Sequence, residues 1–201
     1  MPRFIKPVVF VICLLPLALL IWDAFNDGLG ANPVEAITHR TGDWTLRFLL
    51  LTLSVTPLRL VFGWKKLIRF RRMLGLFAFF YVCLHFLTYL VFDHFFDFGE
   101  IAKDIVKRPY ITVGFSAFVM LIPLAVTSTN KMMKRLGKNW KRLHQLVYVA
   151  AVCGILHYLW LVKADILQPM IYAVILLLLF AVRAWYQRQP AAPATMQYQK
   201  Q

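Results

Sequence analysis

Residues 143–162, LHQLVYVAAVCGILHYLWLV, form an apolar stretch that is long enough to cross a bilayer and contains two histidines, His144 and His157. A spanning helix needs about 20 mostly apolar residues. A third histidine, His85, lies deep in an earlier apolar stretch. Ionisable side chains are costly in hydrocarbon, so those that occur there usually serve a function. Because imidazole is also a common ligand of haem iron, the three histidines are candidate metal ligands.

Six apolar stretches predict an all-α fold, a polytopic membrane helix bundle. Hydrophobic residues make up 60% of the 201 residues, and the mean hydropathy is +0.63, above the usual apolar share of a soluble domain. The predicted spans are residues 7–24, 44–63, 74–92, 110–127, 143–162 and 166–186. The loops between them are too short for a nucleotide-binding domain. We expect one haem-binding membrane domain over residues 1–187 and a disordered cytoplasmic tail over residues 188–201, which are rich in proline and glutamine.

The charged residues predict how the spans are oriented. The formal net charge is +14, but if the loops alternate between two sides the charges divide unevenly. Sixteen of the 23 lysines and arginines fall on the side of residues 1–6, 64–73, 128–142 and the tail from Arg183, and all nine acidic residues fall on the other side. This follows the positive-inside rule. We therefore expect both termini in the cytoplasm and contact with membrane lipid, and no nucleic-acid partner.

Helix geometry places two of the histidines at matching depths. Counted from the cytoplasmic ends of their spans at about 1.5 Å per residue, His85 lies about 20 Å deep and His157 about 22 Å deep. Two axial ligands of one haem iron must oppose each other at one level. We predict that His85 and His157 ligate one haem in the outer half of the membrane, if their helices are neighbours. The alternative is that each ring only hydrogen-bonds to a backbone carbonyl.

His144 lies near the cytoplasmic boundary, two residues after Arg142. The positions that would oppose it on the third span are Arg71 and Arg72, which do not ligate iron. Three interpretations stay open: a second haem with an unusual partner, a different cofactor on the inner side, or a helix end near the headgroups. Thirteen helix positions do not return to the same face, so we expect a distortion, with Gly154 as its candidate site, if His144 and His157 serve one channel.

Arginines provide candidate sites for anionic groups of a cofactor. Arg47 lies at a depth suited to the propionates of an outer haem, and Arg59, Arg71 and Arg72 gather on the inner side, where a flavin phosphate could bind. The alternative is that these side chains extend to the lipid headgroups and bind no cofactor.

Six short motifs occur in a characteristic order along the chain. They are Thr56-Pro57-Leu58-Arg59, Arg71-Arg72-Met73-Leu74-Gly75, Phe79-Phe80-Tyr81 followed by His85, Arg108-Pro109-Tyr110, Thr127-Ser128 and Trp140-Lys141-Arg142-Leu143-His144. This set, over roughly residues 40–165, resembles the MsrQ family, the haem-binding membrane subunit of a bacterial periplasmic methionine-sulfoxide reductase system. More distantly, the chain is similar to the ferric-reductase transmembrane domain that NADPH oxidases share.

The resemblance implies an electron-transfer subunit of the bacterial inner membrane rather than a catalytic subunit, with no catalytic residue of its own. It implies heme b and FMN as cofactors. Electrons would come from a cytoplasmic flavin reductase or from the quinol pool, and would pass to a periplasmic molybdopterin-containing subunit that reduces methionine sulfoxide in oxidised proteins. His85, His144 and His157 match the family's haem-ligand histidines. The chain departs from the wider oxidase pattern, because its third span has one histidine instead of two.

Two other functions remain open on the sequence. One is a stand-alone reductase that uses quinol or reduces metal ions such as ferric iron. The other is a proton or metal-ion transporter that uses the histidines within the membrane. Transporters often have repeated halves, and their proton paths often contain buried carboxylates; the sequence shows no evident repeat of helix pairs and no such carboxylates. We expect a partner to dock on the acidic outer loops, residues 23–43 and 92–109.

Overall fold

The computed structural model describes residues 4–162 and 165–188, and within these ranges the chain is helical, with no β-strand. Six helices are long and apolar enough to span a membrane, as the sequence predicts. Their bounds are α1 Ile5–Phe25, α2 Pro33–Phe62, α3 Arg71–Thr88 with a π-helical extension over Tyr89–Asp93, α5 Pro109–Val126, α8 Leu146–Leu161 preceded by α7 Lys138–Leu143, and α9 Leu167–Arg188. The predicted tail lies outside the described residues, except for Arg188.

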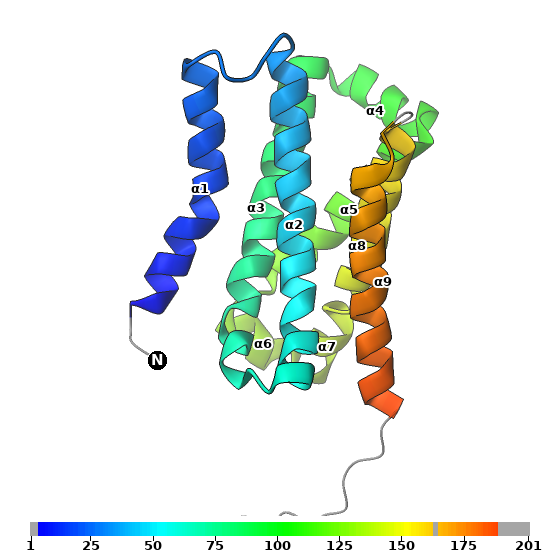
Figure 1. The fold of residues 1–201 in the computed structure, drawn as a ribbon. Helices are drawn as coiled ribbons and strands as arrows, with labels where there is room; N and C mark the ends of the chain where they lie inside the picture. The colour runs from blue at the N-terminus through cyan, green and yellow to red at the C-terminus, as the bar shows by residue number, and fades with distance from the viewer. Residues whose placement is uncertain (1–3, 163–164, 189–201) are drawn as a thin grey trace, which may run out of the picture.

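The long helices lie side by side in one bundle (Figure 1). α2 packs along α3, and α5 packs along α8. The short helix α4, Phe98–Lys107, lies at one end of the bundle, and α6, Asn130–Leu136, lies with α7 at the other. We call these the α4 end and the α6 end. α1 begins and α9 ends at the α6 end, so both termini of the described chain lie on the same side.

Two helices differ from the sequence prediction because of polar capping groups. α2 begins at Pro33, eleven residues before the predicted span, since the Asn32 side chain accepts a hydrogen bond from the Glu35 amide and Pro33 occupies the first turn. α4 forms inside a segment predicted as a loop, where the Asp97 side chain accepts from the Glu100 amide. The α4 end of the bundle is therefore more helical than expected.

Tyr81 is almost completely buried at the centre of the bundle and links α3 to α1. Its hydroxyl donates to the carbonyl of Cys13 at 3.0 Å and accepts from the amide of Leu17 at 3.2 Å. Pro16 interrupts the backbone hydrogen bonds of α1 at this point. Membrane helices tolerate proline when neighbouring groups satisfy backbone atoms that the helix leaves unpaired, and the Tyr81 hydroxyl bonds to the Cys13 carbonyl and the Leu17 amide beside Pro16.

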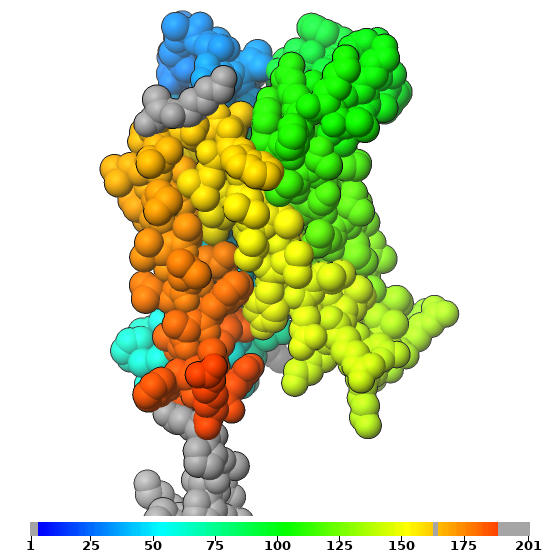
Figure 2. All heavy atoms as spheres, turned by 90° about the vertical axis from the view of Figure 1, so that its right-hand side faces the viewer, coloured from blue at the N-terminus to red at the C-terminus, as the bar shows by residue number. Residues whose placement is uncertain are grey.

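Apolar side chains also cover the outside of the helices, where a soluble protein would be polar. Leu19, Val152, Leu177 and Leu178 are among the exposed large hydrophobic residues. Figure 2 shows the face formed by α5 (green), α8 (yellow) and α9 (orange), with the segment around α6 and α7 projecting beside the lower part of α9. An apolar exterior along six long helices is typical of a multi-pass membrane protein.

Candidate functional site

A cavity of about 520 Å³ lies between α2, α3, α5 and α8. This volume is in the range of sites that enclose an organic cofactor. The walls are mainly apolar, and polar groups gather at the α4 end. The apolar lining includes Leu46, Leu49, Val82, Phe86, Phe118, Leu121 and Ala150.

The rings of His85 and His157 line this cavity and face each other from α3 and α8. Their centres are 6.2 Å apart and their planes are inclined by 74°. Two imidazole nitrogens on opposite sides of one metal, each about 2.0 Å from it, place the ring centres roughly 6 Å apart. The two rings therefore lie at one level of the bundle, and their separation suits two imidazoles bound to one iron.

Hydrogen bonds to the backbone fix which nitrogen of each ring can bind a metal. Nδ1 of His85 lies 2.9 Å from the carbonyl oxygen of Thr38, and Nδ1 of His157 lies 2.7 Å from that of Tyr110. A carbonyl only accepts, so each Nδ1 carries the proton and donates it. Nε2 of each neutral ring is then left with a free lone pair. Metal-bound histidines usually have this second hydrogen bond. A ring that bonds to a backbone carbonyl can therefore also bind a metal, and the two alternatives given for His85 and His157 are compatible.

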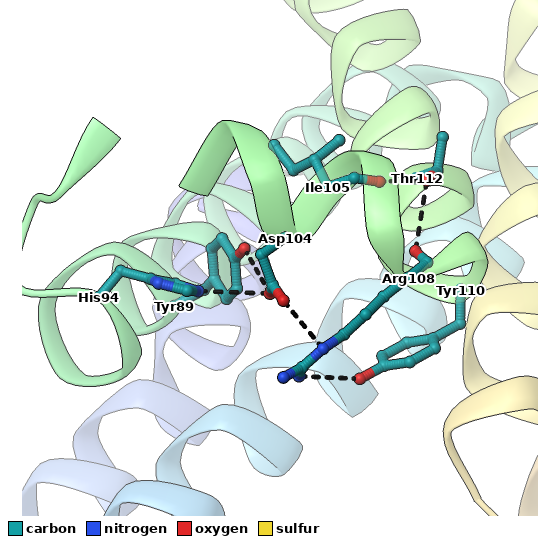
Figure 3. A network of polar contacts seen from close by, with 7 residues as sticks. All are labelled: Tyr89, His94, Asp104, Ile105, Arg108, Tyr110 and Thr112. Atoms are coloured by element: carbon teal, nitrogen blue, oxygen red, sulfur yellow. Dashed lines mark hydrogen bonds and ion pairs between the residues drawn. The ribbon is translucent and has the colours of Figure 1, made fainter. Parts of the chain in front are cut away.

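A polar network around Asp104 closes over the α4 end of the cavity (Figure 3). The Asp104 carboxylate accepts from the Tyr89 hydroxyl at 3.0 Å, contacts Nε2 of His94 at 3.3 Å and pairs with Nε of Arg108 at 2.8 Å. Arg108 also donates to the Tyr110 hydroxyl at 3.3 Å. This hydrogen bond, together with the nearby charge of Asp104, raises the pKa of Arg108. A permanent cation therefore lies at the mouth of the cavity.

Arg47, predicted to face an outer haem, lies elsewhere. Its Nε donates to the Tyr172 hydroxyl at 3.0 Å, its guanidinium lies over the Trp44 ring, and Nη2 is 3.6 Å from the Asp43 carboxylate. These contacts hold Arg47 towards α9, and it is not among the residues that line the cavity. Depth along α2 was predicted from the sequence, but the direction of the side chain around the helix was not.

His144 lies at the α6 end, outside the lining of the cavity. Its ring stacks on that of Trp140 with centres 3.9 Å apart, its Nδ1 is 3.0 Å from the Trp140 carbonyl, and its Nε2 is 3.5 Å from the Ser128 hydroxyl. The helix is interrupted at His144, between α7 and α8, and continues unbroken through Gly154. The interruption lies at His144 and not at Gly154, the position expected for a distortion if the two histidines serve one channel.

The three arginines that the sequence predicts to gather on one side of the membrane lie together near the α6 end. Arg59 is in the last turn of α2, and Arg71 and Arg72 begin α3. Arg72 contacts the side-chain oxygen of Asn130, at the start of α6. Arg59 and Arg72 are exposed, whereas Arg71 is half-buried. These three basic residues thus gather at one end of the bundle, the α6 end.

Comparison with known proteins identifies the family. Residues 41–155 match the family model described as ferric reductase like transmembrane component. The chain is 60% identical over 190 residues to the protein-methionine-sulfoxide reductase heme-binding subunit MsrQ of Herminiimonas arsenicoxydans, covering 92% of this chain and 87% of that protein. It is 58% identical to MsrQ of Rhodospirillum rubrum, covering 87% and 85% of the two chains. It is 54% identical to MsrQ of Polaromonas naphthalenivorans, covering 90% and 84%. The chain belongs to the MsrQ family. No solved structure matches it.

Membership of the MsrQ family confirms the resemblance seen in the sequence. In the part of the chain that the structure describes, no group of three or more histidine, cysteine or acidic residues is placed to hold a metal ion. Two opposed imidazoles suit an iron whose remaining four ligands come from a porphyrin. Arg108 lines the cavity but was not predicted to do so, although it lies in the motif Arg108-Pro109-Tyr110.

Proposed function

We propose that this protein is the haem-binding membrane subunit of a protein-methionine-sulfoxide reductase system and conducts electrons through a b-type haem held by His85 and His157. The observation that carries the proposal is the pair of opposed imidazoles, 6.2 Å apart, each with Nδ1 bonded to a carbonyl. The names of relatives that are 54–60% identical over most of the chain support the same activity.

The residues around the cavity fit a haem. Nε2 of His85 and Nε2 of His157 would bind the iron, and the apolar side chains between them would exclude water from it. Arg108, at the mouth, would pair with a propionate, because a guanidinium binds carboxylates well. Haem itself supplies a one-electron carrier, and the protein sets its potential through ligand type and burial. The polar mouth and apolar interior match the two ends of the porphyrin.

We further propose that the α6 end faces the cytoplasm and the α4 end the periplasm, in the bacterial inner membrane. The basic α6 end and the acidic residues near the α4 end support this orientation. His144, Arg59, Arg71 and Arg72 would hold a cofactor at the inner side, either FMN or a second haem, through which electrons would enter. The donor would be a cytoplasmic flavin reductase or quinol, and the acceptor a periplasmic molybdopterin-containing subunit that docks on residues 23–43 and 92–109.

The test is the reduced-minus-oxidised absorption spectrum of the purified full-length protein from haem-replete cells. We expect a b-type haem spectrum, its loss in the variants His85→Ala and His157→Ala, and its retention in the control variant Arg47→Gln, whose side chain lies outside the cavity lining. A colourless protein, or a haem that survives both replacements, would overturn the proposal. A colourless protein would favour a transporter. A haem protein that reduces ferric iron at the expense of quinol but transfers no electrons to the periplasmic subunit would be a stand-alone reductase.

A further inference from the structure

Two glycines lie directly against the rings of the two cavity histidines. A Cβ atom added to Gly114 would be 2.7 Å from Nδ1 of His157, and one added to Gly42 would be 3.1 Å from Cε1 and 3.2 Å from Nδ1 of His85. Ordinary contacts of a Cβ atom begin near 3.4 Å. The His157 ring therefore occupies space that a side chain at residue 114 would fill, and the His85 ring lies closer to residue 42 than an ordinary Cβ contact allows.

Each glycine is four residues after the carbonyl that the same histidine uses. His85 bonds to the carbonyl of Thr38, four residues before Gly42, and His157 bonds to that of Tyr110, four residues before Gly114. In an α-helix, residues i and i+4 lie one above the other on the same face, and the carbonyl of residue i points towards residue i+4. A ring that reaches the carbonyl from the side must therefore pass over residue i+4. Without a Cβ atom at that position, the ring can come close enough to donate its proton.

The same arrangement occurs twice, with an offset of 72 residues. Thr38, Gly42 and His85 in α2 and α3 correspond to Tyr110, Gly114 and His157 in α5 and α8, and each histidine is 47 residues after its carbonyl. Ala78 and Ala150, each seven residues before a histidine, are both completely buried. No repeat of helix pairs is evident in the sequence, but around the cavity the contacts of the pair α2–α3 recur in the pair α5–α8. His85 and His157 are thus held by the same set of contacts, a carbonyl and a glycine one helical turn after it.

From this geometry we infer that Gly42 and Gly114 are positioning residues for the haem proposed above. By lacking a side chain, they let His85 and His157 lie against α2 and α5, where the carbonyl bonds fix the tautomer, the angle and the separation of the two rings. This inference rests on the proposed haem site, and it assigns the orientation of the ligands to two residues that do not touch iron.

The contacts predict a graded effect of alanine at the two positions. To relieve the contact in Gly114→Ala, the His157 ring must move by about 0.7 Å, which lengthens its 2.7 Å bond beyond the usual limit of about 3.2 Å for a hydrogen bond. Gly42→Ala requires a shift of only about 0.3 Å at His85, which would lengthen its 2.9 Å bond to no more than about 3.2 Å, still within the usual range of a hydrogen bond. Gly75 is the matched control, because its added Cβ atom would meet the Thr52 side chain at an ordinary 3.5 Å.

The experiment compares the full-length protein with Gly114→Ala, Gly42→Ala and Gly75→Ala, by haem content per protein, haem affinity and the low-temperature EPR spectrum of the ferric form. Removing the second hydrogen bond of a metal-bound histidine typically lowers metal affinity about 10–100-fold, and we expect a loss in this range for Gly114→Ala, with a changed low-spin signal. We expect a smaller EPR shift with near-normal haem content for Gly42→Ala. Gly75→Ala should match the wild type.

Each outcome decides either the inference or the proposed function. A wild-type protein without haem overturns the proposed function. A wild-type haem protein whose EPR signal is unchanged in both Gly42→Ala and Gly114→Ala overturns the inference alone. If Gly114→Ala does not accumulate in the membrane, Gly42→Ala decides: a shifted signal at normal protein yield supports the inference, and an unshifted one refutes it. A change of the same size in Gly75→Ala would also refute it.

Discussion

Replacing Asp104 by asparagine should loosen the short helix that covers the mouth of the cavity. Asp104 lies on α4, and its carboxylate joins this helix to Tyr89 and His94 after α3 and to Arg108 before α5. The side chain of Asp104 is 12% exposed, whereas that of Arg108 is 57% exposed, so solvent weakens the ion pair with the arginine. Hydrogen bonds to a charged group contribute about 1.5–3 kcal/mol each. With that screening, we estimate a local loss of about 2 kcal/mol for the whole network.

A loss of about 2 kcal/mol corresponds to amide hydrogen exchange roughly 30-fold faster in residues 98–107, if these residues exchange by local opening. Mass spectrometry of the protein in lipid nanodiscs measures this rate. Lys103→Gln is the matched control, because it breaks only an exposed pair with Glu100 on the same helix, and it should change the exchange rate little. If Asp104→Asn exchanges no faster than Lys103→Gln, the network does not hold α4 in place.

Three further replacements separate the roles assigned to other residues. Arg108→Gln should lower haem affinity severalfold by removing the cation at the mouth, whereas Arg47→Gln, away from the cavity, should leave it unchanged; equal effects in a haem-binding titration would contradict this assignment. Tyr81→Phe should lower the thermal unfolding temperature, because the Cys13 carbonyl and the Leu17 amide lose their partner, at a cost of about 1–2 kcal/mol in the free energy of unfolding. The haem spectrum should not change; a spectral change would mean that Tyr81 acts on the site. His144→Ala should keep the spectrum of the His85–His157 haem but slow its reduction by a flavin reductase in stopped-flow measurements; unimpaired reduction would remove His144 from the inner path.

The sequence was sufficient to predict the helical spans because hydrophobicity and helix rise are properties of one segment at a time. The same reasoning placed His85 and His157 at one depth, and the structure brings their rings together. The start of α2 and the presence of α4 depend on Asn32 and Asp97, polar caps that a hydropathy pattern does not register.

Features that depend on how two helices face each other could not be predicted. Arg47 and Arg108 were distinguishable only once the direction of each side chain around its helix was known, since depth alone favoured Arg47. The hydrogen bonds from His85 and His157 require the register of α3 against α2 and of α8 against α5. The repeat of glycine and histidine positions was present in the sequence, but it acquires meaning only through these contacts.

The most direct test of the account is EPR with hyperfine spectroscopy on the ferric protein, containing isotope-labelled histidine, to count the imidazole nitrogens bound to the iron. We predict a low-spin iron with two histidine nitrogens, and a signal typical of strongly inclined imidazole planes, as the 74° between the rings indicates. A high-spin iron, or a low-spin iron with a single histidine nitrogen, would contradict the opposed pair of His85 and His157.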